Sequence, residues 1–215
     1  MKNIVILISG RGSNLEALIA ARQAGHLPVN IAAVISNRAA APGLETAARA
    51  GIATQCIDHQ TFAGREAFDA ALADCIDGFH PDLVVLAGFM RILSDGFVRH
   101  YSGRLINIHP SLLPSFAGLH THRRALEEGV RIHGCTVHFV TPALDHGPVI
   151  IQAAVPVLDD DCEETLAARV LEQEHQIYPL AVRWFAEDRL RLENGRVRLN
   201  AELLANSALV SPLLR

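Results

Sequence analysis

Short apolar runs alternate with helical segments through the first half of the chain. Residues 3–8 (NIVILI) are rich in β-branched residues and predict a strand that is buried on both faces. Residues 14–21 carry apolar side chains on one side of a predicted helix. The pattern continues with predicted strands at 29–35, 52–57 and 82–87 and predicted helices at 43–50 and 65–76. Such a β-α-β rhythm predicts a parallel sheet with right-handed crossovers.

The second half of the chain predicts fewer helices and more strands. Strands are expected at 105–108, 135–140 and 149–157, with a helix at 121–128. A long helix follows the acidic triplet 159–161, and Asp161 and Glu164 resemble a capping pair at its start. No repeat or linker interrupts the chain. We therefore expect a single domain over residues 1–215, an α/β fold with a Rossmann-like, mostly parallel twisted sheet and helices on both faces.

Composition and charge exclude several classes of protein. Of 215 residues, 50% are hydrophobic and 20% are charged, which excludes a disordered chain. The formal net charge of −4 disfavours an electrostatic nucleic-acid binder, and no apolar run approaches the ~20 residues of a membrane helix. The cysteines bear on where the protein is found. Four cysteines without a C-x-x-C motif are expected to be reduced. Reduced cysteines lead us to expect a cytoplasmic protein, and the N-terminal residues are not typical of a signal peptide. We also expect small-molecule substrates, no nucleic-acid or membrane partner, and a monomer or homodimer.

The first candidate site is the loop at 9–14 (SGRGSN), between the first strand and the first helix. Glycines allow the backbone to approach an anion, and the N–H groups at a helix start then face it. The spacing matches neither the dinucleotide fingerprint nor a Walker A motif. The alternative is an ordinary tight turn.

The second candidate site combines Asn107, His109 and Asp145. Asn107 and His109 point the same way in a strand, because side chains alternate. Histidine supplies a proton near neutral pH, and an asparagine amide can donate to a developing oxyanion. If Asp145 meets His109, its carboxylate would orient the imidazole. The alternatives are a hydrogen-bonded pair at a strand end and an Asx turn at Asp145.

A third group contains four histidines, His120, His122, His133 and His138. Metal ligands must converge and be supported by further hydrogen bonds, and nothing in this spacing imposes that. We expect no metal.

Five motifs taken together resemble the folate-dependent formyltransferase family, in the branch that acts on glycinamide ribonucleotide. They run in order as ISGRGSN (8–14), LAGFMRIL (86–93), NIHPSLLP (107–114), GLHTH (118–122) and DHGP (145–148). The likeness extends from about residue 2 to about residue 192. It implies the formyltransferase fold, with a phosphate-binding half at about 1–104, a catalytic half at about 105–192 and a tail at 193–215.

The resemblance implies transfer of a formyl group from 10-formyltetrahydrofolate, as co-substrate, to the amine of glycinamide ribonucleotide in purine biosynthesis. The family's catalytic residues correspond to Asn107, His109 and Asp145. Its residues for the ribonucleotide correspond to Gly12, Ser13, Asn14 and Glu174. Its folate pocket corresponds to Arg65, Met90, Arg91, Ile92, Leu93 and Asn107, with the backbone of Thr141, Pro142, Ala143, Leu144 and Asp145.

Two positions depart from the family pattern, and other activities stay open. Pro142 replaces a frequently acidic residue, and Leu171 replaces a frequently polar one. The alternatives are a formyltetrahydrofolate hydrolase, a formyltransferase for initiator methionyl-tRNA, and a non-catalytic binding module on the same fold. The tRNA enzyme would need a tRNA-binding surface, and a non-catalytic module would not need His109 and Asp145 together.

Overall fold

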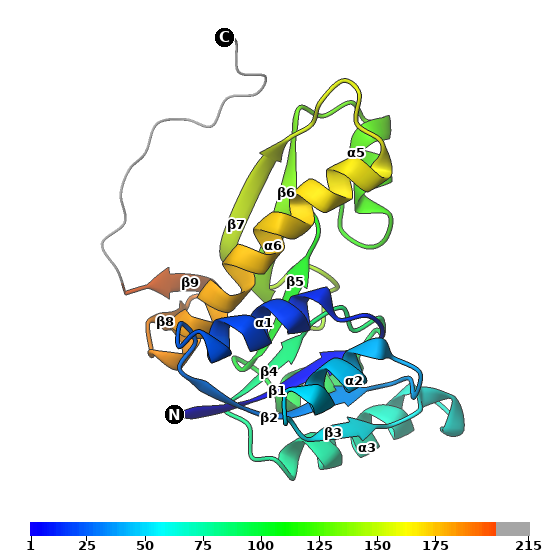
Figure 1. Ribbon diagram of the computed structural model, residues 1–215, viewed down its shortest axis with the longest axis vertical. Helices are drawn as coiled ribbons and strands as arrows, with labels where there is room; N and C mark the ends of the chain where they lie inside the picture. The colour runs from blue at the N-terminus through cyan, green and yellow to red at the C-terminus, as the bar shows by residue number, and fades with distance from the viewer. Residues whose placement is uncertain (201–215) are drawn as a thin grey trace.

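Seven strands form one sheet in the computed structural model, which describes residues 1–200 (Figure 1). The strand order is β3-β2-β1-β4-β5-β6-β7, in which β1 to β5 run parallel and β6 and β7 are antiparallel to their neighbours. The strands are β1 (Lys2–Ile8), β2 (Val29–Ser36), β3 (Thr54–Cys56), β4 (Leu83–Leu86), β5 (Leu105–His109), β6 (Ile132–Phe139) and β7 (Val149–Pro156). The prediction of a mostly parallel sheet is confirmed.

Helices cover both faces of this sheet, as predicted. One face packs against α1 (Ser13–Gln23), α2 (Pro42–Arg49), α5 (Thr121–Glu127) and α6 (Glu163–Ala186). The opposite face packs against α3 (Arg65–Asp77) and α4 (Asp95–His100). A short 3-10 helix, η1 (His59–Thr61), precedes α3.

The strand β1 shows why residues 4–8 are all apolar. Ile4, Ile6 and Ile8 lie in the hydrophobic core on the α1 and α6 side of the sheet. Val5 and Leu7 lie in the core on the α3 and α4 side. Because side chains alternate and both faces are covered, every position of this buried part of the strand is hydrophobic.

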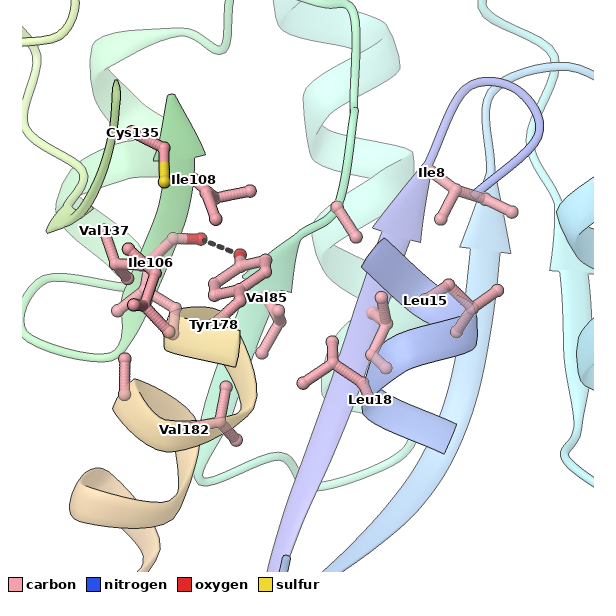
Figure 2. Packing of buried hydrophobic residues seen from close by; sticks show 14 of the residues in the cluster. Ile8, Leu15, Leu18, Val85, Ile106, Ile108, Cys135, Val137, Tyr178 and Val182 are labelled. Atoms are coloured by element: carbon pink, nitrogen blue, oxygen red, sulfur yellow. Dashed lines mark hydrogen bonds between the residues drawn. The ribbon is translucent and has the colours of Figure 1, made fainter. Parts of the chain in front are cut away.

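The helix α6 is fastened to the middle of the sheet by Tyr178. Its ring is fully buried, and its hydroxyl donates to the carbonyl of Leu86 at 2.8 Å and to that of Ile106 at 3.4 Å. Figure 2 shows the ring among the core side chains, pointing toward β5. Burial raises the pKa of this phenol, so the hydroxyl stays a donor. The contact fixes α6 against β4 and β5, two strands that lead into the candidate site.

Three features differ from the sequence predictions. The helix α4 was not predicted. The helix α6 begins with Cys162 and Thr165 as its capping pair in place of Asp161 and Glu164. The Asp161 carboxylate instead accepts hydrogen bonds from the Leu158 backbone and the Arg169 guanidinium. Part of the predicted tail forms a hairpin of β8 (Leu190–Glu193) and β9 (Arg196–Leu199).

The rest of the predicted tail, 201–215, lies outside the described residues. Among residues 1–200, no helix is both long enough and apolar enough to cross a membrane.

The topology places the loops after β1 and β4 beside one another. β1 pairs with β2 on one side and with β4 on the other, so the direction of the crossovers reverses between β1 and β4. In open α/β sheets, ligands bind outside the carboxyl ends of the strands at such a reversal. β5 runs parallel to β4 and ends at His109, at this same edge of the sheet.

Candidate active site

The strand β5 presents Asn107 and His109 on one side, two residues apart, as the sequence predicts. His109 is buried, and its Nδ1 lies 3.6 Å from the Asp145 carboxylate. Its Nε2 lies 3.1 Å from the carbonyl oxygen of Phe116. The structure therefore brings together the three residues that the sequence selected for catalysis.

Asp145 reaches His109 from a tight turn between β6 and β7. Its φ of 53° lies in the left-handed region, which aspartate tolerates better than most residues. The carboxylate oxygen that faces His109 also accepts a hydrogen bond from the Gly118 backbone N–H at 2.8 Å. Asp145 thus joins the β6–β7 turn to the segment that follows β5.

Both ring nitrogens of His109 face oxygen atoms that only accept hydrogen bonds. One is the Asp145 carboxylate and the other is the Phe116 carbonyl. The imidazolium can donate to both, whereas a neutral ring has one N–H. To donate to a substrate, Nε2 must exchange the Phe116 carbonyl for the substrate atom. The segment at 110–120 therefore has to adjust when a ligand enters.

The predicted anion loop contains a glycine that needs its conformational freedom. Gly12 is the N-cap of α1 with a φ of 78°. A Cβ atom there would lie 3.3 Å from Leu15 Cβ and 3.6 Å from Gly43 Cα. Gly43, in the first turn of α2, donates its N–H to the Gly10 carbonyl at 3.2 Å. Gly43 therefore supports the loop from behind, a role that the sequence did not reveal.

We expect Gly12→Ala to strain the loop and Gly10→Ala to leave the fold intact. Alanine pays ~1–2 kcal/mol in the left-handed region, and its methyl group would press on Leu15. A Cβ atom at Gly10 meets open space. Thermal unfolding should show a melting temperature several degrees lower for Gly12→Ala only. Equal melting temperatures for both variants would contradict this account of the loop.

The loop contacts the predicted ribonucleotide residue on α6. The Asn14 Nδ2 donates to the Glu174 carboxylate at 2.7 Å, and both side chains are buried. Burial raises the pKa of Glu174, and the hydrogen bond from Asn14 opposes this shift. Asn14 Oδ1 is also buried and has no partner among the described residues. The pair therefore offers an unsatisfied acceptor beside a carboxylate.

The raised pKa of Glu174 predicts a pH dependence of stability. A carboxyl group whose folded pKa exceeds its unfolded pKa loses stability as the pH rises through the two values. Glu174→Gln removes this loss, and its amide oxygen can still accept from Asn14. The variant's melting temperature relative to wild type should therefore increase from pH 4 to pH 7. The exposed Glu172→Gln is the matched control, and an equal trend in both variants would contradict the assignment.

Ser9 joins the predicted anion loop to the predicted folate loop. Its hydroxyl donates to the Asn37 side chain at 2.6 Å and accepts from the Met90 backbone N–H at 2.7 Å. Ser9 and Asn37 are both buried. A displacement of the predicted folate loop at Met90 therefore alters a hydrogen bond of Ser9 in the predicted anion loop, and the reverse is also true.

Three of the predicted folate residues have exposed apolar side chains. Met90, Ile92 and Leu144 are 66%, 60% and 55% exposed. Exposed apolar side chains on loops at the carboxyl edge of the sheet are consistent with a ligand site. The Arg91 guanidinium lies over the Phe68 ring, 5.8 Å from its centroid, and Phe68 follows Arg65 by three residues on α3. Arg91 therefore packs against α3, the helix that begins at Arg65.

The turn at 141–145 holds its shape through internal hydrogen bonds. The Thr141 hydroxyl donates to the Ala143 carbonyl at 3.2 Å, and the His146 ring pairs with the Leu144 carbonyl at 2.7 Å. Pro142 is exposed and interrupts neither contact. Leu171 lies on α6, one turn before Glu174.

The four histidines separate into different environments. The rings of His122 and His133 are 5.3 Å apart and perpendicular, while His138 faces Asn107. Burial lowers the pKa of His133 to about 4, so this ring is neutral at physiological pH. Within residues 1–200, no group of His, Cys, Asp and Glu side chains has a geometry that could hold a metal.

Sequence reasoning missed the backbone partners of the catalytic residues. The Phe116 carbonyl and the Gly118 N–H contact His109 and Asp145, yet backbone groups leave no mark in a residue pattern. His138 was considered only as a metal ligand. Its spacing of two from Thr136 on a predicted strand was the signal that both side chains lie on one face of the sheet.

Comparisons with known proteins agree with this geometry. A family model described as formyl transferase matches residues 2–182. The phosphoribosylglycinamide formyltransferase of Escherichia coli (strain K12) is 55% identical over 202 residues, which cover 94% of this chain and 95% of that protein. The crystal structure of glycinamide ribonucleotide transformylase 1 from Symbiobacterium toebii superposes with a TM-score of 0.90 at 51% identity, covering 93% and 94% of the two chains.

A formyltetrahydrofolate deformylase from Pseudomonas syringae pv. tomato is more distant. Its TM-score is 0.87 at 29% identity, and the match covers 92% of this chain and 65% of that one. The predicted fold and the predicted class of enzyme, a formyltransferase, are both confirmed. The chain belongs to the formyl transferase family.

Proposed function

We propose that this chain transfers the formyl group of 10-formyltetrahydrofolate to the amino group of N1-(5-phospho-D-ribosyl)glycinamide in purine biosynthesis. One observation carries the proposal. Asn107, His109 and Asp145 meet at the edge of the sheet where β1 and β4 end and the loops after them begin. The relatives named above, phosphoribosylglycinamide formyltransferases, support the choice of substrates.

The reaction begins with the neutral substrate amine attacking the formyl carbon. The new C–N bond gives a tetrahedral adduct whose oxygen carries negative charge. The Asn107 amide N–H and the protonated His109 ring are the donors for that oxygen, and such donors act mainly on the transition state. The bond between the formyl carbon and N10 then breaks, N10 takes up a proton, and the former amine releases one.

Asp145 acts through His109. Its carboxylate lies 3.6 Å from Nδ1, so it orients the ring and keeps Nε2 directed toward the substrate side. The hydrogen bond from Gly118 holds the carboxylate in place. Closing of the segment at 110–120 over the substrates would also exclude water, which protects the formyl group from hydrolysis.

The ribonucleotide phosphate binds at the loop that contains Gly12, Ser13 and Asn14. Backbone N–H groups at the start of α1 and the positive end of its dipole favour an anion without a lysine. Glu174, held by Asn14, lies next to this loop and can accept hydrogen bonds from the substrate's hydroxyl or amine groups.

The folate binds on the other side of the catalytic trio. Its pterin lies against the loop of Met90, Arg91, Ile92 and Leu93 and against the backbone of 141–145, while Arg65 provides positive charge for its glutamate carboxylates. Two substrates bound side by side on rigid strand ends supply much of the rate through proximity.

The experiment supplies purified protein with 10-formyltetrahydrofolate, with and without the ribonucleotide. We expect tetrahydrofolate and N-formyl product in equal amounts, and no tetrahydrofolate when the ribonucleotide is omitted. Release of tetrahydrofolate and formate without the ribonucleotide would overturn the proposal in favour of a hydrolase.

A further inference from the structure

His138 lies directly opposite Asn107 in the antiparallel pair of β5 and β6. Its side chain is only 2% exposed, and its Nε2 lies 3.4 Å from the Asn107 amide nitrogen. The proposed mechanism gives this histidine no role, and it belongs to no group of side chains within residues 1–200 that could hold a metal. It is a buried titratable group in direct contact with a proposed oxyanion donor.

The hydrogen-bond partners determine which ring nitrogen of His138 carries the proton. Nδ1 lies 2.9 Å from the carbonyl oxygen of Phe139, which can only accept, so Nδ1 carries the hydrogen. Burial lowers the pKa of His138, and the charge of His109 reinforces this shift, while the hydrogen bond to the Phe139 carbonyl and the charge of Asp145 oppose it. The net lowering of the pKa favours the neutral ring. Nε2 therefore has a free lone pair, and it faces the Asn107 amide.

This lone pair selects one of two orientations of the Asn107 amide. The nitrogen and oxygen of an asparagine amide occupy nearly the same space and exchange by a half-turn of the side chain. An acceptor at His138 favours the orientation in which Nδ2 faces the ring. One N–H then points at His138, and the second N–H stays available to a substrate oxygen.

We propose that His138 is a positioning residue that holds the Asn107 amide in its donor orientation toward the developing oxyanion. This proposal rests on the proposed formyl transfer. With the amide reversed, Asn107 would present its oxygen to a negatively charged atom and would repel it. His138 thus acts on the reaction only through Asn107.

The surrounding backbone is built to keep His138 in this position. The β6–β7 register shifts between Val137 and His138, and such irregularities redirect side chains near active sites. A Cβ atom at Gly147 would lie 1.6 Å from the Phe139 carbonyl oxygen and 3.3 Å from His138 Nδ1. Only glycine lets the turn that carries Asp145 pack against the carbonyl that holds His138. His138 contacts Asn107, and the turn that contains Gly147 carries Asp145. The packing of this turn against β6 therefore positions both Asn107 and Asp145 beside His109.

The test compares His138→Leu, which removes the acceptor, with His138→Gln, whose amide oxygen can accept from Asn107 close to the place of Nε2. We expect His138→Leu to lower kcat by ~10–100-fold, less than the ~10²–10³-fold of losing the donor itself, with each KM within about twofold of wild type. His138→Gln should retain several-fold more kcat than His138→Leu.

The double variant Asn107→Ala/His138→Leu distinguishes positioning from a general structural role. Because His138 acts through Asn107, the double variant should be no slower than Asn107→Ala alone. Losses that multiply would overturn the proposal, as would a His138→Leu variant with a kcat within twofold of wild type. If His138→Leu fails to fold, a His138→Gln variant as slow as Asn107→Ala overturns it.

A spectroscopic measurement tests the geometry independently of any activity. Long-range ¹H–¹⁵N NMR of histidine-labelled protein should show His138 as the neutral Nδ1–H tautomer between pH 6 and pH 8. An Nε2–H tautomer or a charged ring would overturn the proposal, even if the protein transfers formyl groups as proposed. A correct tautomer in a protein without formyl transfer would instead overturn the proposed function.

Discussion

Replacing His109 with alanine should lower kcat by ~10²–10³-fold while the KM of each substrate changes little. The protonated ring is assigned to charge that exists only in the tetrahedral adduct, so its loss raises the barrier without weakening the ground-state complex. The deletion also leaves the Asp145 carboxylate facing an empty space in the middle of the site.

Initial-rate kinetics with both substrates measure this effect. His26→Ala is the matched control, because His26 is exposed at the end of α1 and should leave kcat unchanged. A His109→Ala variant with near-wild-type kcat would show that another group stabilises the adduct.

Asp145→Asn should lower kcat by ~10²-fold and leave the fold intact. The asparagine oxygen can still accept from the Gly118 N–H, so the turn should keep its conformation. The negative charge beside His109 Nδ1 disappears, however, and the protonated ring loses its electrostatic partner.

The kinetics are compared with those of Asp160→Asn, which removes a carboxylate from the triplet before α6. Only Asp145→Asn should lose activity, and circular dichroism should be the same for both variants. A kcat of Asp145→Asn within twofold of wild type would mean that Asp145 does not contribute through charge.

The short apolar runs between helical segments were sufficient to predict a mostly parallel sheet. In β1, Ile6 and Leu7 face opposite cores, and such a run is hydrophobic throughout because helices cover both faces. The same periodicity placed Asn107 and His109 on one side of β5. These predictions depend on local geometry alone, which the sequence determines directly.

The meeting of Asp145 with His109 could not be derived from spacing. It depends on the antiparallel pairing of β5, β6 and β7 and on a left-handed conformation at Asp145. Both are properties of tertiary structure, and the resemblance to a known family supplied what local reasoning lacked. The contact of Asn14 with Glu174, 160 residues apart, has the same origin.

The hairpin of β8 and β9 was missed although its signal is present. Asn194 and Gly195 adopt φ values of 49° and 73°, as a two-residue turn with the twist of a hairpin requires. The flanking Leu192 and Val197 pair across the turn. The segment was read as a tail because these strands are short and largely exposed.

The most direct test of the central claim follows the formyl carbon itself. The protein is mixed with 10-formyltetrahydrofolate labelled with ¹³C in the formyl group, and with ¹⁵N-glycinamide ribonucleotide, and the products are observed by NMR. We predict a ¹³C signal split by one-bond coupling to the ¹⁵N of the glycinamide amine, as formyl transfer requires. Label that appears as free formate, with no coupling to nitrogen, would contradict the account.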